Sequence, residues 1–252
     1  TYIVYMQRRI MNILFYRYGS ICEPDIIASF KHLGFNITED TREVYNKQLL
    51  PSDCIKGLNE LLKQDTYSFI FSINFFPSVS DVCNIWGIPY LCLIVDSPVL
   101  ELFSTSLANP CNKVFLFDRQ LYNDFHHINP DGIFHIPLAT NVRDNYATAT
   151  MASSADRARF STDISFIGSL YSEKCLYNKI TLPEKMRGYV DGLIEAQLLV
   201  YGYNFIEECV TPELIDSFTK ARPELTNFPS SMKVDTKAVI AQHIISVKVA
   251  DQ

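Results

Sequence analysis

The feature that most constrains the fold is a series of six short apolar segments that alternate with segments of helical periodicity. Residues 90–95 are apolar at every position, which is typical of a parallel strand covered on both faces. The other apolar segments are residues 11–18, 35–38, 68–73, 113–117 and 133–136. Strands that alternate with helices in this way predict an α/β fold, a Rossmann-like, doubly wound parallel sheet.

The six segments all lie in the first part of the chain. With 252 residues, 48% of them apolar, the chain can form one large domain or two small ones. Residues 11–145 predict the Rossmann-like domain, and residues 146–162, which are rich in Ala, Thr and Ser without a period, predict a linker. Residues 163–252 predict the start of a second domain, with a buried strand at 163–167 followed by helices. Residues 1–10 fit an upstream extension better than a secretory leader.

Composition and charge exclude several classes of protein. The net charge is −6, from 22 basic and 28 acidic residues, without a basic stripe, so a nucleic-acid-binding protein is not expected. The uncharged stretches are too short for a membrane span. The seven cysteines are odd in number and form no Cys-x-x-Cys pair, which predicts free thiols in a reducing cytoplasm.

The common cofactor and metal motifs are missing from the sequence. None of the nine glycines forms Gly-x-Gly, so neither a dinucleotide fingerprint nor a glycine-rich phosphate loop is present. A Gly-x-Ser-x-Gly nucleophile turn is also missing. The five histidines do not pair at metal-ligand spacing, and no Asp-x-Asp pair occurs. We therefore expect no cofactor and no metal.

Five short motifs follow one another along the first two thirds of the chain. They are Met-Asn-Ile-Leu-Phe-Tyr at 11–16, Val-Asp-Ser-Pro at 95–98, Phe-Asp-Arg at 117–119 with Tyr122, His-Ile-Pro-Leu-Ala at 135–139, and Asp-Ile-Ser-Phe-Ile-Gly-Ser-Leu-Tyr at 163–171. In this order they resemble bacterial glycosyltransferases of the spore-maturation-protein type. The resemblance covers roughly residues 11–171 and implies the two-domain GT-B architecture.

The resemblance implies that a sugar moves from a nucleotide-diphosphate donor to an acceptor hydroxyl on a carbohydrate or protein. The first domain would then form the acceptor side of a cleft, and Gly168 and Ser169 would lie near the donor phosphates. A full second domain of this type contains several strand–helix units, whereas residues 163–252 predict only one strand. We therefore expect the N-terminal portion of such an enzyme, inactive alone, with a homodimer as a further arrangement to test.

Ligands of open parallel sheets bind beyond the carboxyl ends of the strands, so the side chains that follow each strand are the candidate site residues. Asp96 follows the fourth strand directly, either as a general base for the acceptor hydroxyl or as the cap of the next helix. Glu23 is an alternative base, or an acid that stabilises a helix start. The candidate substrate-binding residues are Arg17, Tyr18, Gly19, Asn74, Ser97, Asp118 and Arg119.

Two of these regions have a second interpretation that is purely structural. Asp118 precedes a predicted helix and is typical of a helix cap. The aromatic residues after Asn74, which are Phe75 and Phe76, fit either sugar stacking or core packing.

A rival function is a non-catalytic Rossmann-like binding or interaction module. An apolar helical stripe in the C-terminal part motivates it, through Leu193, Ala196, Leu199 and Val200. A receiver-like regulator that uses Asp96 is less consistent with the sequence, because the companion acidic cluster after the first strand is missing.

Overall fold

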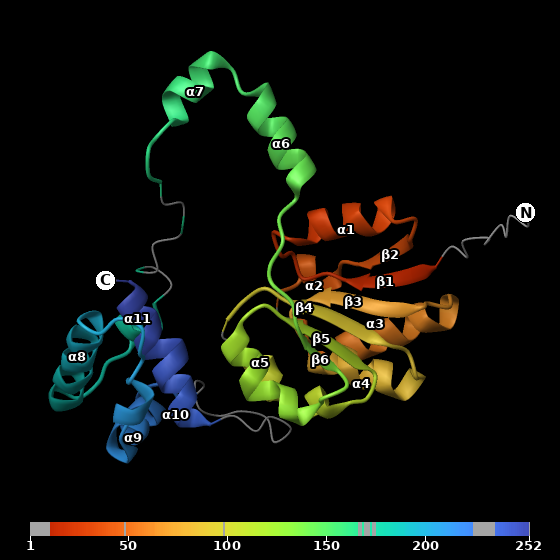
Figure 1. Cartoon of the computed structure of the whole chain (residues 1–252). Coiled ribbons are helices and arrows are strands. Elements are labelled where there is room, and N and C mark those ends of the chain that lie inside the picture. Colours follow the sequence, from red (N-terminus) through yellow and green to blue (C-terminus); the bar gives the residue numbers. More distant parts are fainter. Residues whose placement is uncertain are drawn as a thin grey trace, which may run out of the picture. The chain divides into compact units, whose positions relative to one another are not determined.

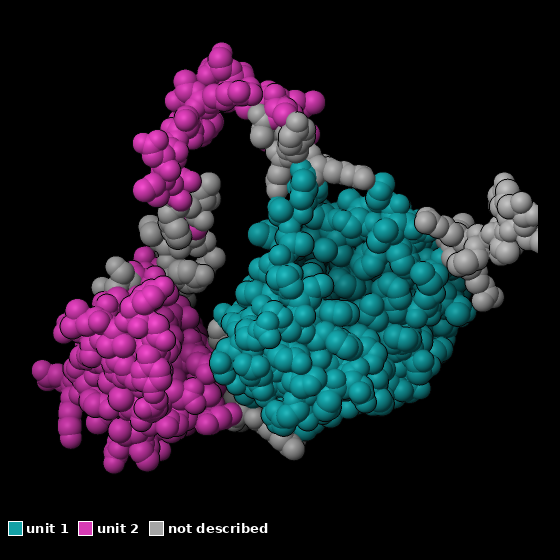
Figure 2. Space-filling model, viewed as in Figure 1, with its two compact units in different colours: residues 1–142 teal, residues 143–252 magenta. Residues whose placement is uncertain are grey.

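The computed structural model describes residues 11–47, 49–97, 99–165, 168, 172, 175–223 and 235–251, without the side chains of residues 143–146 and 149. The chain divides into two compact units, residues 1–142 and residues 143–252 (Figure 2). Each unit has its own cluster of buried apolar side chains.

Unit 1 contains a six-stranded sheet in which every neighbouring pair of strands is parallel. The strands are β1 Asn12–Tyr16, β2 Asn36–Asp40, β3 Phe69–Ile73, β4 Tyr90–Ile94, β5 Asn112–Leu116 and β6 Ile133–His135. Their order across the sheet is β2-β1-β3-β4-β5-β6. The prediction of a Rossmann-like α/β fold is confirmed.

Prolines mark the start of three helices of unit 1, and a glycine caps the end of one of them. They are α1 Glu23–His32, α2 Arg42–Tyr45, α3 Pro51–Gln64, α4 Pro77–Trp86 and α5 Arg119–Phe125. A proline stands in the first turn of α1, α3 and α4, where its missing N–H costs no hydrogen bond. Gly87 ends α4 in a left-handed conformation, with φ of 65°.

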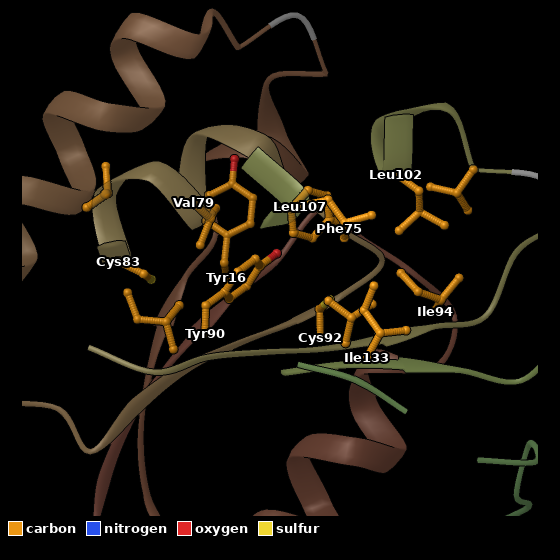
Figure 3. Packing of buried hydrophobic residues seen from close by; sticks show 14 of the residues in the cluster. Tyr16, Phe75, Val79, Cys83, Tyr90, Cys92, Ile94, Leu102, Leu107 and Ile133 are labelled. Atoms are coloured by element: carbon orange, nitrogen blue, oxygen red, sulfur yellow. The ribbon is translucent and has the colours of Figure 1, made fainter. Parts of the chain in front are cut away.

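The sheet separates two apolar layers (Figure 1). On one face α1 packs through Ile27 against Phe15 and Phe71. On the other face α3, α4 and α5 cover the large cluster drawn in Figure 3, to which Tyr16 and Tyr90 contribute fully buried rings. Burial on both faces explains why β4 carries no polar side chain.

Three short 3-10 helices connect the later strands of the sheet. They are Leu100–Phe103, Thr105–Ala108 and His126–Ile128. The first two take the place of the helix that the sequence predicts after β4. All seven cysteines of the chain are free, and Cys83 and Cys92 are fully buried.

Unit 2 is helical throughout the part that is described. Its helices are α6 Val142–Met151, which starts at the unit boundary, α7 Ser154–Phe160, α8 Glu184–Leu198, α9 Pro212–Ala221, α10 Thr236–Val239 and α11 Ser246–Ala250. The π-helical segment Ile240–Ile245 joins α10 to α11, and 3-10 turns lie at Leu176–Lys179 and Glu207–Cys209. None of the described helices is long and apolar enough to cross a membrane.

One expectation for the C-terminal part differs from the structure. The buried strand predicted at 163–167 is wrong for its described residues, because residues 163–165 are not in a strand and Ile164 is exposed. Phe166 and Ile167 lie outside the described residues. The segment 146–162, predicted as a linker, contains most of α6 and all of α7, which Ser153 and Asp156 cap reciprocally.

The apolar stripe of the C-terminal part lies on α8 and just after it. The face of α8 that packs into unit 2 carries Val190 and Ile194. Of the four stripe residues, Leu193 is half-buried, and Ala196, Leu199 and Val200 are exposed, Leu199 at 88%. The stripe therefore lies beside the buried face of the helix.

Candidate functional site

The order of the strands fixes where a ligand site is expected. The chain leaves β1 towards β2 and then returns across β1 to β3, so the carboxyl ends of β1 and β3 flank the point at which the winding direction changes. Open parallel sheets bind their ligands in the crevice at this switch point. The loops after β1, β3 and β4 supply its side chains, because β4 is the next neighbour of β3.

Glu23 organises the loop after β1. Its carboxylate is fully buried, and Oε1 accepts hydrogen bonds from the backbone N–H groups of Tyr18 (2.9 Å), Gly19 (2.8 Å) and Ser20 (3.1 Å). Oε2 accepts from Nε of Arg17 at 2.8 Å. Both oxygens are engaged within the protein, which favours the helix-start role of Glu23 over the general-base role.

The two basic side chains of the same loop region are also engaged. Arg17 donates through Nη1 to Glu39 on β2, at 2.6 Å, in addition to its bond with Glu23. Lys47 donates through Nζ to the backbone carbonyl of Tyr18 and lies 5.7 Å from the centre of the Tyr18 ring. Gly19 adopts a φ of 91°, a value that side chains disfavour.

Asn74 connects the three loops. Its Nδ2 donates to the hydroxyl of Tyr18 at 2.9 Å and to Oδ2 of Asp96 at 2.5 Å. Its Oδ1 accepts from the backbone N–H of Val95 at 3.1 Å. One carboxamide thus links the ends of β1, β3 and β4 at the switch point.

Asp96 is exposed, and the interpretation of Asp96 as a helix cap is wrong. The next helical element starts at Leu100, and its N-cap position is Val99. Asp96 thus lies three positions before the N-cap and does not cap this element. Asp96 therefore faces the loops of the switch point with one oxygen on Asn74.

The chain matches no protein-family model, and no curated protein matches it.

Ser97, Asp118 and Arg119 form the neighbouring part of the edge, after β4 and β5. Ser97 donates through Oγ to Oδ2 of Asp118 at 3.0 Å. The other oxygen of Asp118 accepts from the backbone N–H groups of Gln120 (2.7 Å) and Leu121 (3.2 Å), so Asp118 caps α5. Arg119 is exposed in the first turn of that helix.

The remaining predicted residues are the two aromatic residues after Asn74 and the two donor-site candidates of unit 2. Phe75 is buried and packs against Tyr90, which supports the core interpretation over sugar stacking. Phe76 packs on the rings of Tyr16 and Tyr18, with centroids 4.9 Å and 5.5 Å away. Gly168 is exposed in unit 2, and Ser169 lies outside the described residues.

A second polar cluster lies at the end of β2. The sequence alone does not predict it. Asp40 is 3% exposed and forms a two-point ion pair with Arg42, through Nε at 2.8 Å and through Nη2. The Tyr16 hydroxyl donates to Glu43, and burial raises the pKa of both the Tyr16 phenol and the Glu43 carboxyl. The one available sign was an Asp directly after a strand, the same pattern that selected Asp96 and Asp118.

A hollow in unit 1 lies away from the switch point. The hollow, of about 350 Å³, is lined by Gly87, Pro89 and Cys111, which precede β4 and β5 and so lie at the amino edge of the sheet. No group of three or more His, Cys, Asp or Glu side chains in the described part could hold a metal ion.

The juxtaposition of Tyr18 and Asp96 has a consequence for titration. Burial raises the pKa of the Tyr18 phenol, and the negative charges of Asp96 and Glu23 raise it further, while contact with Ser20 lowers it. Replacing Asp96 by asparagine removes one negative charge, so we expect the pKa of Tyr18 to fall. The ¹³Cζ resonance of labelled Tyr18, followed against pH by NMR, measures this change. Asp131→Asn, at the opposite edge, should leave the Tyr18 titration unchanged.

Proposed function

We propose that unit 1 binds the acceptor in a glycosyl-transfer reaction, with Asp96 as the carboxylate that receives the proton of the acceptor hydroxyl. The observation that supports this proposal is the position of Asp96. It is exposed, it follows β4, and Asn74 holds it beside Tyr18 at the switch point of the sheet.

Glycosyl transfer to a hydroxyl requires a general base in hydrogen-bond contact with that hydroxyl. In the inverting form of the reaction, the acceptor oxygen forms a bond to C1 of the donor sugar. The bond between C1 and the diphosphate oxygen breaks, and the nucleoside diphosphate leaves with the bonding electron pair. The hydroxyl proton passes to Oδ1 of Asp96, the oxygen that does not contact Asn74.

In this proposal the loop after β1 does not bind the donor diphosphate. The N–H groups of that loop, which would be the natural phosphate ligands at the start of α1, donate to Glu23. By the resemblance, Gly168 and Ser169 are the candidates for donor contacts.

A second candidate is a binding module without catalysis. It is favoured by unit 2, whose described residues form helices and no strand, unlike the Rossmann-like second domain of GT-B enzymes. Both candidate functions place the ligand at the switch point. Only glycosyl transfer would release nucleoside diphosphate.

Release of nucleoside diphosphate separates the two functions. We expect the product of the whole gene, given UDP-, GDP- and dTDP-sugars together with methyl glycosides as acceptors, to release diphosphate from one of the donors. Asp96→Asn should lower that rate about 100-fold or more, the usual contribution of a positioned base. Asp131→Asn, an exposed aspartate before β6, is the control and should keep the wild-type rate. Glycoside binding without diphosphate release from any donor would leave only the binding module.

A further inference from the structure

The backbone of Asn74 marks this residue as unusual. Its φ is 58°, and no other non-glycine residue in the described ranges has a positive φ. Left-handed backbone costs an ordinary side chain about 1 kcal/mol, less for Asn, and such residues cluster at sites where geometry matters. Ser72 Oγ donates to the Asn74 carbonyl at 2.7 Å and so helps to hold this conformation.

The orientation of the Asn74 carboxamide follows from its partners. A backbone N–H can only donate, so the atom that faces Val95 must be the oxygen. The nitrogen therefore faces Tyr18 and Asp96, and each of its two hydrogens has one partner. The amide has no further hydrogen for a ligand, so Asn74 does not bind substrate through Nδ2.

This orientation sets the hydrogen-bonding character of the two neighbours. The Tyr18 oxygen accepts from Asn74 and contacts the Ser20 side chain, whose hydroxyl lowers the Tyr18 pKa as a donor does, so the Tyr18 hydrogen points away from Asn74. Oδ2 of Asp96 accepts from the same nitrogen, which leaves Oδ1 as an acceptor on an exposed side chain. The Tyr18 hydroxyl, as a donor, and Oδ1 of Asp96, as an acceptor, thus lie on either side of the Asn74 amide.

The charges around this pair disfavour an anion. Asp96 is negative, Arg17 is paired with Glu23 and Glu39, and Lys47 is bound to a backbone carbonyl. The three consecutive backbone N–H groups after β1 already donate to Glu23. A phosphate at this position would meet the carboxylate of Asp96. Of the two nearby cations, Arg17 is already paired with two carboxylates, so only the ammonium of Lys47 would offset the repulsion.

We infer that Tyr18 and Asp96 together bind a neutral vicinal diol, with Asn74 as the positioning residue that aims both groups. One hydroxyl of the diol accepts from the Tyr18 O–H, and its neighbour donates to Oδ1 of Asp96. This inference rests on the proposed function, because it names the chemical class of the acceptor. It also assigns Asn74, which the sequence suggested as a ligand contact, to an indirect role.

The test is the affinity of the full chain for neutral and anionic probes, measured by isothermal titration calorimetry. The neutral probes are methyl glucoside, methyl mannoside and methyl galactoside, and the anionic ones are glucose 6-phosphate and UMP. We expect at least one neutral glycoside to bind more tightly than either anion. Equal or tighter binding of the anions, or no binding of any neutral glycoside, overturns the inference.

Side-chain variants then test which side chains bind the glycoside. Tyr18→Phe removes one neutral hydrogen bond and should weaken glycoside binding about 3- to 10-fold, and Asp96→Asn about 10- to 100-fold. Tyr45→Phe, on α2 and 85% exposed, is the matched control and should bind as the wild type does. Unchanged affinity of Tyr18→Phe would exclude Tyr18 from the site.

Two substitutions separate positioning by Asn74 from a purely structural role. Asn74→Gly keeps the left-handed backbone and removes the amide. Asn74→Asp keeps an acceptor for the Val95 N–H but places a carboxylate against Asp96. Positioning predicts that Asn74→Asp binds glycoside more weakly than Asn74→Gly at neutral pH, with both folded by circular dichroism, whereas a structural role predicts the reverse order.

The outcomes of these tests and of the diphosphate-release test are independent. Glycoside binding that depends on Tyr18, without diphosphate release, supports the diol site and overturns glycosyl transfer. Transfer that persists in Tyr18→Phe with unchanged KM for the acceptor overturns the diol site alone.

Discussion

Replacing Glu23 by alanine should lower the free energy of unfolding of unit 1 by about 3–5 kcal/mol, because it removes the buried carboxylate that accepts from three backbone N–H groups and from Arg17. Three backbone N–H groups lose their acceptor, and Arg17 loses one of its two carboxylates. Buried donors without partners cost about 1–3 kcal/mol each, and water can reach part of this loop because Gly19 is exposed. Glu23→Gln should cost less, since one oxygen remains for the N–H groups.

The measurement is urea unfolding followed by the fluorescence of Trp86. Trp86 is the one tryptophan of the chain and lies on α4 of unit 1, so its emission reports this unit separately from unit 2. Asp53→Ala is the matched control, since Asp53 is an exposed acid in the first turn of α3 and should contribute only about 0.3–1 kcal/mol through the helix dipole. Equal costs for Glu23→Ala and Asp53→Ala would show that the carboxylate does not organise the loop.

Replacing Gly57 by alanine should lower the free energy of unfolding of unit 1 by about 2–4 kcal/mol. A Cβ at this position would lie 0.9 Å from Nη1 of Arg42, so the guanidinium has to move. Its movement breaks the ion pair with Asp40, whose side chain is 1% exposed, and the bond from Nη1 to the carbonyl of Asp53 at 3.2 Å. The expected sign is opposite to that of an ordinary helix position, where alanine stabilises relative to glycine.

A double-mutant cycle with Arg42→Ala isolates this effect. Without the arginine the space beside Gly57 is open, so Gly57→Ala should stabilise the Arg42→Ala protein by about 0.5–1 kcal/mol. Gly188→Ala on α8 is a second control, because nothing lies within 4 Å of its added Cβ, and it should raise the stability of unit 2 in circular dichroism. An equal destabilisation by Gly57→Ala in both Arg42 backgrounds would contradict the packing of Arg42 against α3.

The sheet could be predicted from the sequence because its central strands are buried on both faces. A strand such as β4 needs apolar residues at every position, and that pattern is visible without coordinates. The strand predicted at 163–167, Asp-Ile-Ser-Phe-Ile, has only three apolar residues of five, and Ile164 is exposed. Local hydrophobicity favours a strand, but pairing requires a neighbouring strand that only the tertiary fold supplies.

The candidate site could be predicted only as far as the order of the strands allows. Tyr18, Asn74 and Asp96 were selected because each closely follows a strand, and they are brought together by the β1–β3 and β3–β4 pairing. The division of roles among them depends on a positive φ at Asn74 and on the partner of its oxygen, which no sequence pattern encodes. The same holds for Glu23, whose position at a helix start fits a surface acid as well as a buried one.

The central claim, that a neutral ligand binds between Tyr18 and Asp96 at the carboxyl edge of the sheet, can be tested by NMR on protein labelled with ¹³C in its tyrosine rings. The tightest-binding methyl glycoside is added stepwise to the full chain. We expect the Tyr18 resonance to shift and saturate with the ligand, and the Tyr45 resonance, from an exposed ring on α2, to stay unchanged. A glycoside that shifts other tyrosines and leaves Tyr18 in place would contradict the claim.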